Sequence, residues 1–382
     1  MASIELVAPR ADARVSGAVE LRARITGGGP ASRVAFVVGP AEHGTLPAVP
    51  LGGGEYGATW DSTVKLVDRG TPTPGDALYW VTARASVDGV DLVAPHVPVV
   101  TANRPVDGLP AGGWRPELAW EADYDGTLED FARSHSAVIG LAHASLEEDP
   151  TGRPRRVLRA SVPDSAADDA DQPTQGTVRF QAAGRRAIVE GDELCVGWSF
   201  LLGDDFPTVH PADDPANPDG PRGTGYVALF QLYGPPYAQG SPLVLHADRR
   251  SPAEPLDELV IRGNELNPGD PFPLLAIPYR RGRWTDVVLR LRASRSIESG
   301  WVEAYLNQGG ADAVQPVPFV GGLLRVPRVL LRADSEPFRT DMQVYRVAGR
   351  LDRVTVWHTA HRVTRTVAAA DPRTYRPDWG AR

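Results

Sequence analysis

Short runs of alternating apolar and polar residues occupy the first hundred positions of the chain. In residues 18–25, AVELRARI, the apolar side chains fall on one face, because side chains along a strand alternate with a period of two. Glycine-rich turns separate the runs, and this spacing predicts an immunoglobulin-like β-sandwich over residues 1–104, with Trp60, Tyr79 and Trp80 in its core. The expected strands are residues 4–7, 18–25, 34–38, 56–60, 78–85 and 97–100.

A longer stretch, residues 117–382, repeats this pattern, and so many strands in one domain form two stacked sheets. We therefore expect an all-β protein whose second domain is a concanavalin-like β-jelly roll. One short helix is expected at residues 127–133, where Thr127 can cap and Asp130 occupies the third position after it. The expected strands are residues 156–162, 177–182, 194–202, 226–232, 243–247, 259–262, 284–292, 301–306, 326–331, 343–347 and 353–358.

Residues 105–116 are rich in proline and glycine and are interpreted as the linker between the two domains. The segments VSGAVELRA, YGATWD and YWVTARASVDG resemble bacterial immunoglobulin-like modules that precede carbohydrate-active domains. This resemblance implies that the first domain is a spacer or a docking module for an assembly partner.

Composition narrows the class of partner. The 382 residues carry a formal charge of -8 with both signs interspersed, so no concentrated basic face is expected and nucleic acid is disfavoured as a partner. Lys65 is the only lysine among 40 basic residues, which is typical of a high-GC bacterium or its phage. Arginine supplies flat, bidentate donors for carboxylates and sulfates.

The number of cysteines and the first residues of the chain bear on where in or outside the cell the protein acts. Cys195 is alone, so neither an internal disulfide nor a thiolate zinc cluster is expected. No signal peptide is visible, and no apolar run reaches the length that spans a membrane. A protein acting on an extracellular glycan would then be particle-borne or exported by a route that the chain does not encode.

Several catalytic motifs are absent. The chain has no GxSxG, GxxxxGK[ST] or HExxH motif, no GxGxxG that opens a helix, and no E-x-D-x-x-E strand pattern of sandwich glucanases. Hydrolase, nucleotide-binding and zinc-protease functions are therefore disfavoured, and no organic cofactor or metal site is expected. The acidic segments 164–171 and 213–219 leave Ca²⁺ open as an alternative to plain solvated loops.

Polar side chains alternate with apolar ones on two expected strands of the second domain, Arg179 and Gln181 on one and Gln231 and Tyr233 on the other, and a third expected strand adds Tyr345 and Arg346. We expect these groups to converge on one open face. Such a set suits β-elimination from a uronate polymer, in which a guanidinium or amide binds the carboxylate and a phenol or imidazole takes the neighbouring ring proton.

The same block resembles the polysaccharide lyases of heparin-lyase-I and glucuronan-lyase type, which are β-jelly rolls. The resemblance rests on GTVRFQAAGRRAIVEGDELCVGWSFLLGDDFPT, ALFQLYGPPYAQGSPLVLHA, GRWTDVVLRLRAS, SGWVEAYLNQGG and VYRVAGRLDRVTVWHTAHRV. It implies recognition of an acidic polysaccharide, with Gln231 and either Arg179 or Arg186 binding the carboxylate and Tyr345, followed by Arg346, as base or acid.

The chain departs from the family pattern at several positions, since Arg185, Ile188 and Gln181 stand where the family has glutamate. Tyr233 stands where the family has histidine, and Asp341 stands where it has lysine. We count Tyr233 as a candidate catalytic residue, with Arg186, Arg346, Gln181, His246 and His358 as candidate substrate-binding residues. His358 and His361, three apart on one strand, are expected on opposite faces. The departures keep a rival function open: a non-catalytic glycan-binding or structural component of a phage tail, capsid surface or injection-type particle.

Overall fold

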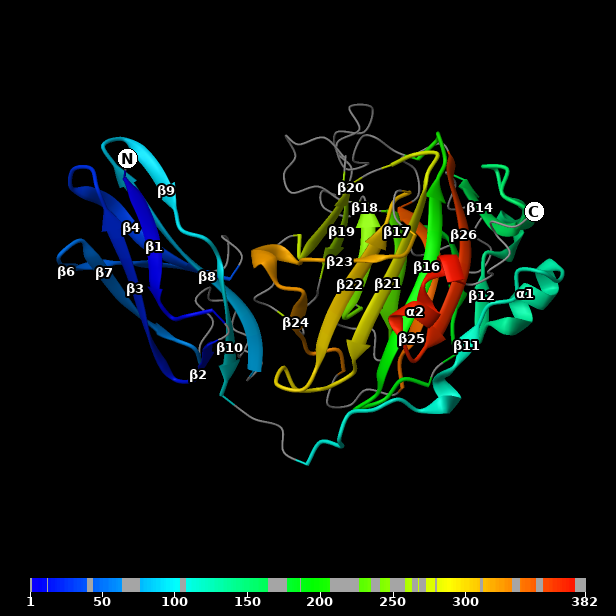
Figure 1. Ribbon diagram of the computed structural model, residues 1–382, viewed down its shortest axis with the longest axis horizontal. Helices are drawn as coiled ribbons and strands as arrows, with labels where there is room; N and C mark the ends of the chain where they lie inside the picture. The colour runs from blue at the N-terminus through cyan, green and yellow to red at the C-terminus, as the bar shows by residue number, and fades with distance from the viewer. Residues whose placement is uncertain are drawn as a thin grey trace.

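The computed structural model describes residues 2–11, 13–39, 44–63, 76–103, 108–163, 177–185, 187–206, 227–234, 241–247, 258–262, 267, 273–278, 280–309, 312–331, 337–347 and 353–374. Over these residues the protein is built almost entirely of antiparallel β-strands (Figure 1). The all-β expectation is confirmed. The N-terminal strands form a small sandwich, and the later strands form a larger two-sheet sandwich of jelly-roll type.

The small sandwich stacks two sheets around a core that includes Leu21, Phe36 and Trp60. Burial alternates along the strand at residues 18–26, as its sequence predicts. In hydrogen-bonded order, the first sheet contains β1 (Ser3–Ala8), β3 (Ala18–Thr26), β7 (Glu55–Asp61) and β6 (Val49–Gly52), and the second contains β2 (Ala13–Val15), β10 (Val97–Ala102), β8 (Asp76–Val87), β4 (Ala31–Val38) and β5 (Thr45–Pro47), with β9 (Val90–Val93) on β8.

The larger sandwich pairs a nine-stranded sheet with a seven-stranded sheet, as far as the described residues go. The nine-stranded sheet runs β13 (Ala144–Glu148), β14 (Arg156–Pro163), β26 (Arg353–Thr364), β16 (Glu193–Leu202), β21 (Trp284–Arg292), β22 (Trp301–Asn307) and β23 (Gln315–Val317), with β11 (Trp120–Glu121) on β26 and β24 (Arg325–Pro327) on β22. The seven-stranded sheet runs β12 (Ala137–Ile139), β15 (Thr177–Ala183), β25 (Arg339–Val347), β17 (Val227–Tyr233), β18 (Leu243–Ala247), β19 (Glu258–Arg262) and β20 (Leu275–Pro278).

Short helical turns complete the fold: α1 (Leu128–Ser134), α2 (Val367–Ala370), η1 (Pro116–Leu118), η2 (Leu141–His143), η6 (Val320–Gly322) and η7 (Pro372–Thr374). The expected helix is confirmed as α1, since the Thr127 side chain accepts from the backbone of Asp130 and the Asp130 carboxylate accepts from the backbone of Thr127. No helix among the described residues is long and apolar enough to cross a lipid bilayer.

The core of the larger sandwich lies between its two sheets. The rings of Trp198 on β16 and Phe230 on β17 stack with centroids 4.0 Å apart, and both side chains are fully buried. Such a stacked pair contributes about 1 kcal/mol beyond the burial of its area. One face of each sheet is thus committed to the core, and the opposite face of the seven-stranded sheet is where its polar alternation places charged and amide side chains.

Two sequence expectations in this region are wrong. The run at residues 326–331 forms a strand only at β24 (Arg325–Pro327), which pairs with β22. His358 and His361 do not lie on opposite faces. The pairing of β16 with β26 shifts register between Gly197 and Ser199, and Ala360 in this bulge has a φ of +55°. A bulge inserts an extra residue, so both histidines turn toward the core.

The two sandwiches contact each other through the outer face of the second small sheet. Strand alternation turns Tyr79 toward Trp60 in the small core and Trp80 the other way. Trp80 is fully buried in the core cluster of the larger sandwich, and its ring lies against Gly321. Arg14 forms an ion pair of 2.6 Å with Glu298 across the same contact. The boundaries 1–104, 105–116 and 117–382 themselves stay a prediction.

Candidate functional site

Three adjacent strands of the seven-stranded sheet bring the predicted polar residues together. β25 lies between β15 and β17, and its register pairs Tyr345 with Arg179, Gln343 with Gln181 and Asp341 with Gln231. Paired residues of adjacent strands share a face of the sheet. We call this surface the polar face; its residues are Arg179, Gln181, Gln231, Tyr233, Arg339, Asp341, Gln343 and Tyr345.

One end of the polar face carries a guanidinium that has no carboxylate partner within the described part of the chain. Arg179 is half-buried and its guanidinium carbon lies 5.5 Å from the centre of the Tyr345 ring. Its Nε is buried without a hydrogen bond, and no ion pair of Arg179 occurs among the described residues. A cation held against an aromatic face but lacking a counter-ion is suited to bind an anion.

The neighbouring position on β25 offers an unused acceptor. Gln343 is 1 % exposed, and its side-chain Oε1 has no hydrogen-bond partner. An unsatisfied buried carbonyl costs about 1–3 kcal/mol. An unpaired donor and an unpaired acceptor therefore lie on adjacent strands, and of the two side chains only that of Arg179 is partly exposed.

The other end of the polar face is organised around Asp341. Its carboxylate is fully buried and accepts from Gln181 Nε2 at 2.5 Å, Gln231 Nε2 at 3.2 Å and Arg339 Nε at 2.8 Å. Burial raises the pKa of Asp341, while Arg339 and the two amides act in the opposite direction. The charge of Arg339 is thus neutralised by Asp341, whereas Arg179 forms no ion pair with a described residue.

Gln231 and Tyr233 are the half-buried side chains at this end. Gln231 accepts a hydrogen bond of 3.0 Å from Ser241 Oγ in addition to donating to Asp341. The Arg339 guanidinium carbon lies 4.8 Å from the centre of the Tyr233 ring. Each of the two tyrosines on the polar face is thus backed by an arginine.

Arg346 and His358, predicted to bind substrate, lie instead in the core. Arg346 is fully buried on the inner side of β25, where its Nη1 donates to the carbonyl of Val162 at 3.4 Å. Next to Tyr345 on a strand, it must point away from the polar face. His358 is fully buried, and burial lowers its pKa to about 3. Both predictions are therefore corrected.

The remaining candidates have different outcomes. Alternation along β18 places His246 on the side opposite Leu243 and Leu245, so it shares a side with the polar face, and its side chain is fully buried. Arg186 lies outside the described residues, as do the acidic segments 164–171 and 213–219. Among the described residues no group of three His, Cys, Asp or Glu side chains could hold a metal ion.

Sequence reasoning missed Gln343 and Arg339 as members of the site and treated Asp341 only as a departure from a family pattern. The signal that could have found them is the alternation Arg339, Asp341, Gln343, Tyr345 along one run of residues, RTDMQVY. Extending the expected strand at residues 343–347 backward by four positions places all four side chains on one face.

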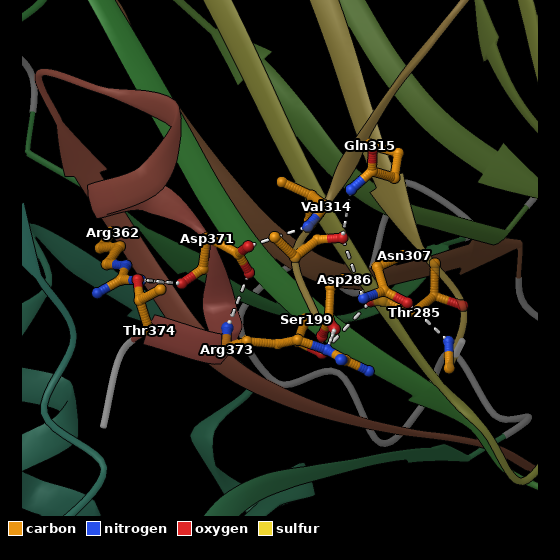
Figure 2. A network of polar contacts seen from close by, with 12 residues as sticks. Ser199, Thr285, Asp286, Asn307, Val314, Gln315, Arg362, Asp371, Arg373 and Thr374 are labelled. Carbon is orange, nitrogen blue, oxygen red and sulfur yellow. Dashed lines mark hydrogen bonds and ion pairs between the residues drawn. The ribbon is translucent and has the colours of Figure 1, made fainter. Parts of the chain in front are cut away.

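A second polar network lies on the outer side of the nine-stranded sheet, beneath α2 and η7 (Figure 2). Asp286 accepts from Ser199 Oγ at 2.6 Å and from Arg373 Nε at 3.2 Å. Asp371 accepts from the backbone of Val314 and of Arg373, each at 2.9 Å. Both carboxylates have hydrogen-bond donors within the protein, so this network links the C-terminal segment to the sheet.

No protein-family model and no curated protein matches the chain. Among solved structures, the GH131 β-glucanase catalytic domain from Podospora anserina is 10% identical with a TM-score of 0.38, over 58% of this chain and 79% of that one. A structure of carbohydrate-binding modules from the β-sandwich superfamily is 8% identical with a TM-score of 0.25, over 95% and 98%.

The endo-β-1,4-mannanase from Thermotoga petrophila is 16% identical with a TM-score of 0.23, over 27% of this chain. The chain spans only 20% of the length of that mannanase. At these TM-scores the likeness carries no argument about function.

Proposed function

We propose that the polar face binds an acidic polysaccharide that contains uronate residues. The observation that carries this proposal is Arg179, a guanidinium with no carboxylate partner among the described residues, held against the ring of Tyr345 on an otherwise polar strand surface. A uronate carboxylate supplies the missing counter-ion, and arginine binds carboxylates in a bidentate fashion.

Cleavage by β-elimination is the second candidate function, and the pairing of Arg179 with Tyr345 favours it. Arg179 would neutralise the uronate carboxylate and so acidify the proton on the adjacent ring carbon. The Tyr345 side-chain oxygen would take that proton as a base and pass it to the leaving glycosidic oxygen, so that the bond from the neighbouring carbon to this oxygen breaks and a carbon–carbon double bond forms.

Calorimetric titration with a panel of uronate polymers tests the binding proposal. Arg179→Ala should weaken binding by about 10- to 100-fold, because a charge-assisted hydrogen-bonded pair contributes about 1.5–3 kcal/mol. Arg159→Ala is the matched control, since Arg159 lies on β14 of the other sheet. Equal affinities of wild type and Arg179→Ala, or no binding to any polymer of the panel, would refute the proposal.

Incubation with the same panel of polymers tests for cleavage, because unsaturated uronates formed by elimination absorb ultraviolet light. A lyase gives rising absorbance that Tyr345→Phe abolishes, while the variant still binds the polymer. Binding without any absorbance change in the wild-type protein would leave a non-catalytic glycan-binding protein, which is the rival function.

A further inference from the structure

The two ends of the polar face differ in charge. Tyr345 and Asp341 are four residues apart on β25, which corresponds to about 13 Å along an extended strand. Arg179 beside Tyr345 has no ion pair among the described residues, whereas Arg339 is neutralised by Asp341 at 2.8 Å. This separation exceeds one sugar ring, so the two ends contact different sugar residues of a bound chain.

Gln231 has limited hydrogen-bonding capacity left at the Asp341 end. An amide has two N–H donors and two lone pairs on its oxygen. Gln231 donates one N–H to Asp341 and accepts one hydrogen bond from the Ser241 hydroxyl. One donor and one acceptor remain, which match a sugar hydroxyl, because a hydroxyl both donates and accepts. A carboxylate only accepts and cannot use the remaining lone pair.

Asp341 also acts through its charge. It cancels the charge of Arg339, with which it forms an ion pair of 2.8 Å beside Gln231, so the Gln231 end offers no net positive charge to a ligand carboxylate. A carboxylate placed there would lose part of its hydration without gaining a counter-ion. The Arg179 end favours a negative charge by the same reasoning.

We propose that Asp341 is a specificity-determining residue that excludes charged sugars from the Gln231 end of the polar face. The glycan selected in this way has a uronate at the Arg179 end and a neutral sugar at the Gln231 end. This inference rests on the proposed binding of an acidic polysaccharide. Asp341 itself is buried, so it acts by its charge and by holding the Gln231 amide.

A matched pair of ligands tests the inference: oligogalacturonates of one length, either fully ionised or with half of their carboxyls methyl-esterified. Titration should show the wild-type protein binding the half-esterified ligand about tenfold more tightly. Asp341→Asn keeps the shape and removes the charge, so it should reduce this ratio toward one by tightening binding of the ionised ligand. Asp286→Asn is the control, a buried acid of the other sheet, and should leave the ratio unchanged.

A second variant covers the case in which Asp341→Asn does not fold. Gln231→Glu adds a carboxylate at a half-buried position and should widen the preference for the half-esterified ligand. A wild-type ratio near one, or a ratio that neither variant changes, overturns the inference while the proposed glycan binding survives. Failure of the wild-type protein to bind either ligand and every polymer of the panel overturns both.

Discussion

At the scale of single residues, three of the histidines that the structure describes are buried in the core of the larger sandwich: His135, His358 and His361. His135 and His361 pack edge-on against the ring of Trp120, with centroid distances of 5.1 and 4.9 Å. Burial lowers the pKa of His135 to about 4 and that of His358 to about 3, and it lowers the pKa of His361 well below its ordinary value. All three are therefore neutral in the folded protein near pH 7.

These histidines should make the protein less stable in mild acid. A histidine in the unfolded chain has a pKa near 6.5, so below that pH the unfolded chain binds protons that the folded protein does not bind. The free energy of unfolding should fall by about 1.4 kcal/mol per pH unit for each histidine between about pH 6 and the folded pKa. His135→Phe keeps an aromatic ring and removes one titrating group, so it should reduce this slope by about 1.4 kcal/mol per pH unit. Urea unfolding at several pH values measures the slope. Identical slopes for the variant and the wild type would contradict the prediction.

At the scale of elements, the short segment formed by α2 and η7 packs on β16 and β21 and covers Cys195. A Cβ at Gly197 would overlap the carbonyl oxygen of Ala370, so glycine at this position allows the segment to lie against the sheet. Burial raises the pKa of the Cys195 thiol to about 12. The side chain is fully buried beneath this cover.

Gly197→Ala should displace the segment, costing about 1–3 kcal/mol of stability, and expose the thiol. The rate at which a thiol reagent modifies Cys195 should then rise by about tenfold or more, because exposure increases both access and thiolate content. Gly113→Ala is the control, since a Cβ at Gly113 meets no atom within 4 Å. Equal labelling rates for wild type and Gly197→Ala would show that the segment does not need this glycine.

Strand alternation predicted most of the elements and one face of the site, because a period of two is a local property of the chain. It placed Arg179, Gln231 and Tyr345 on one face, and the register of β15, β25 and β17 shows them there. It could not predict the bulge at Ala360, which depends on how β26 pairs with β16, and so it misplaced His361.

At the scale of the whole molecule, alternation also says which residues share a face but not what covers that face. Trp80 was expected in the core of the small sandwich, yet it is buried against the larger one. A Cβ at Gly321 would overlap its ring, so the two sandwiches approach each other closely there (Figure 1). The partner of an apolar strand face is a long-range property that the pattern alone does not carry.

The hydrogen-bond network of Asp341 illustrates the same limit at the site. Its partners Gln181 and Gln231 are 160 and 110 residues away in the chain, and only the folded sheet brings them to one carboxylate. The residue types were visible in the sequence, whereas the structure was needed to show that Arg339 is paired and that Arg179 forms no ion pair with any residue the structure describes.

The central claim is that the polar face of the seven-stranded sheet holds a uronate at Arg179. A crystal structure of the protein with a uronate-containing tetrasaccharide tests it most directly. We predict a sugar carboxylate within hydrogen-bonding distance of the Arg179 guanidinium and beside the Tyr345 ring. A tetrasaccharide bound to the small sandwich or to the outer side of the nine-stranded sheet, with the polar face left vacant, would contradict the claim.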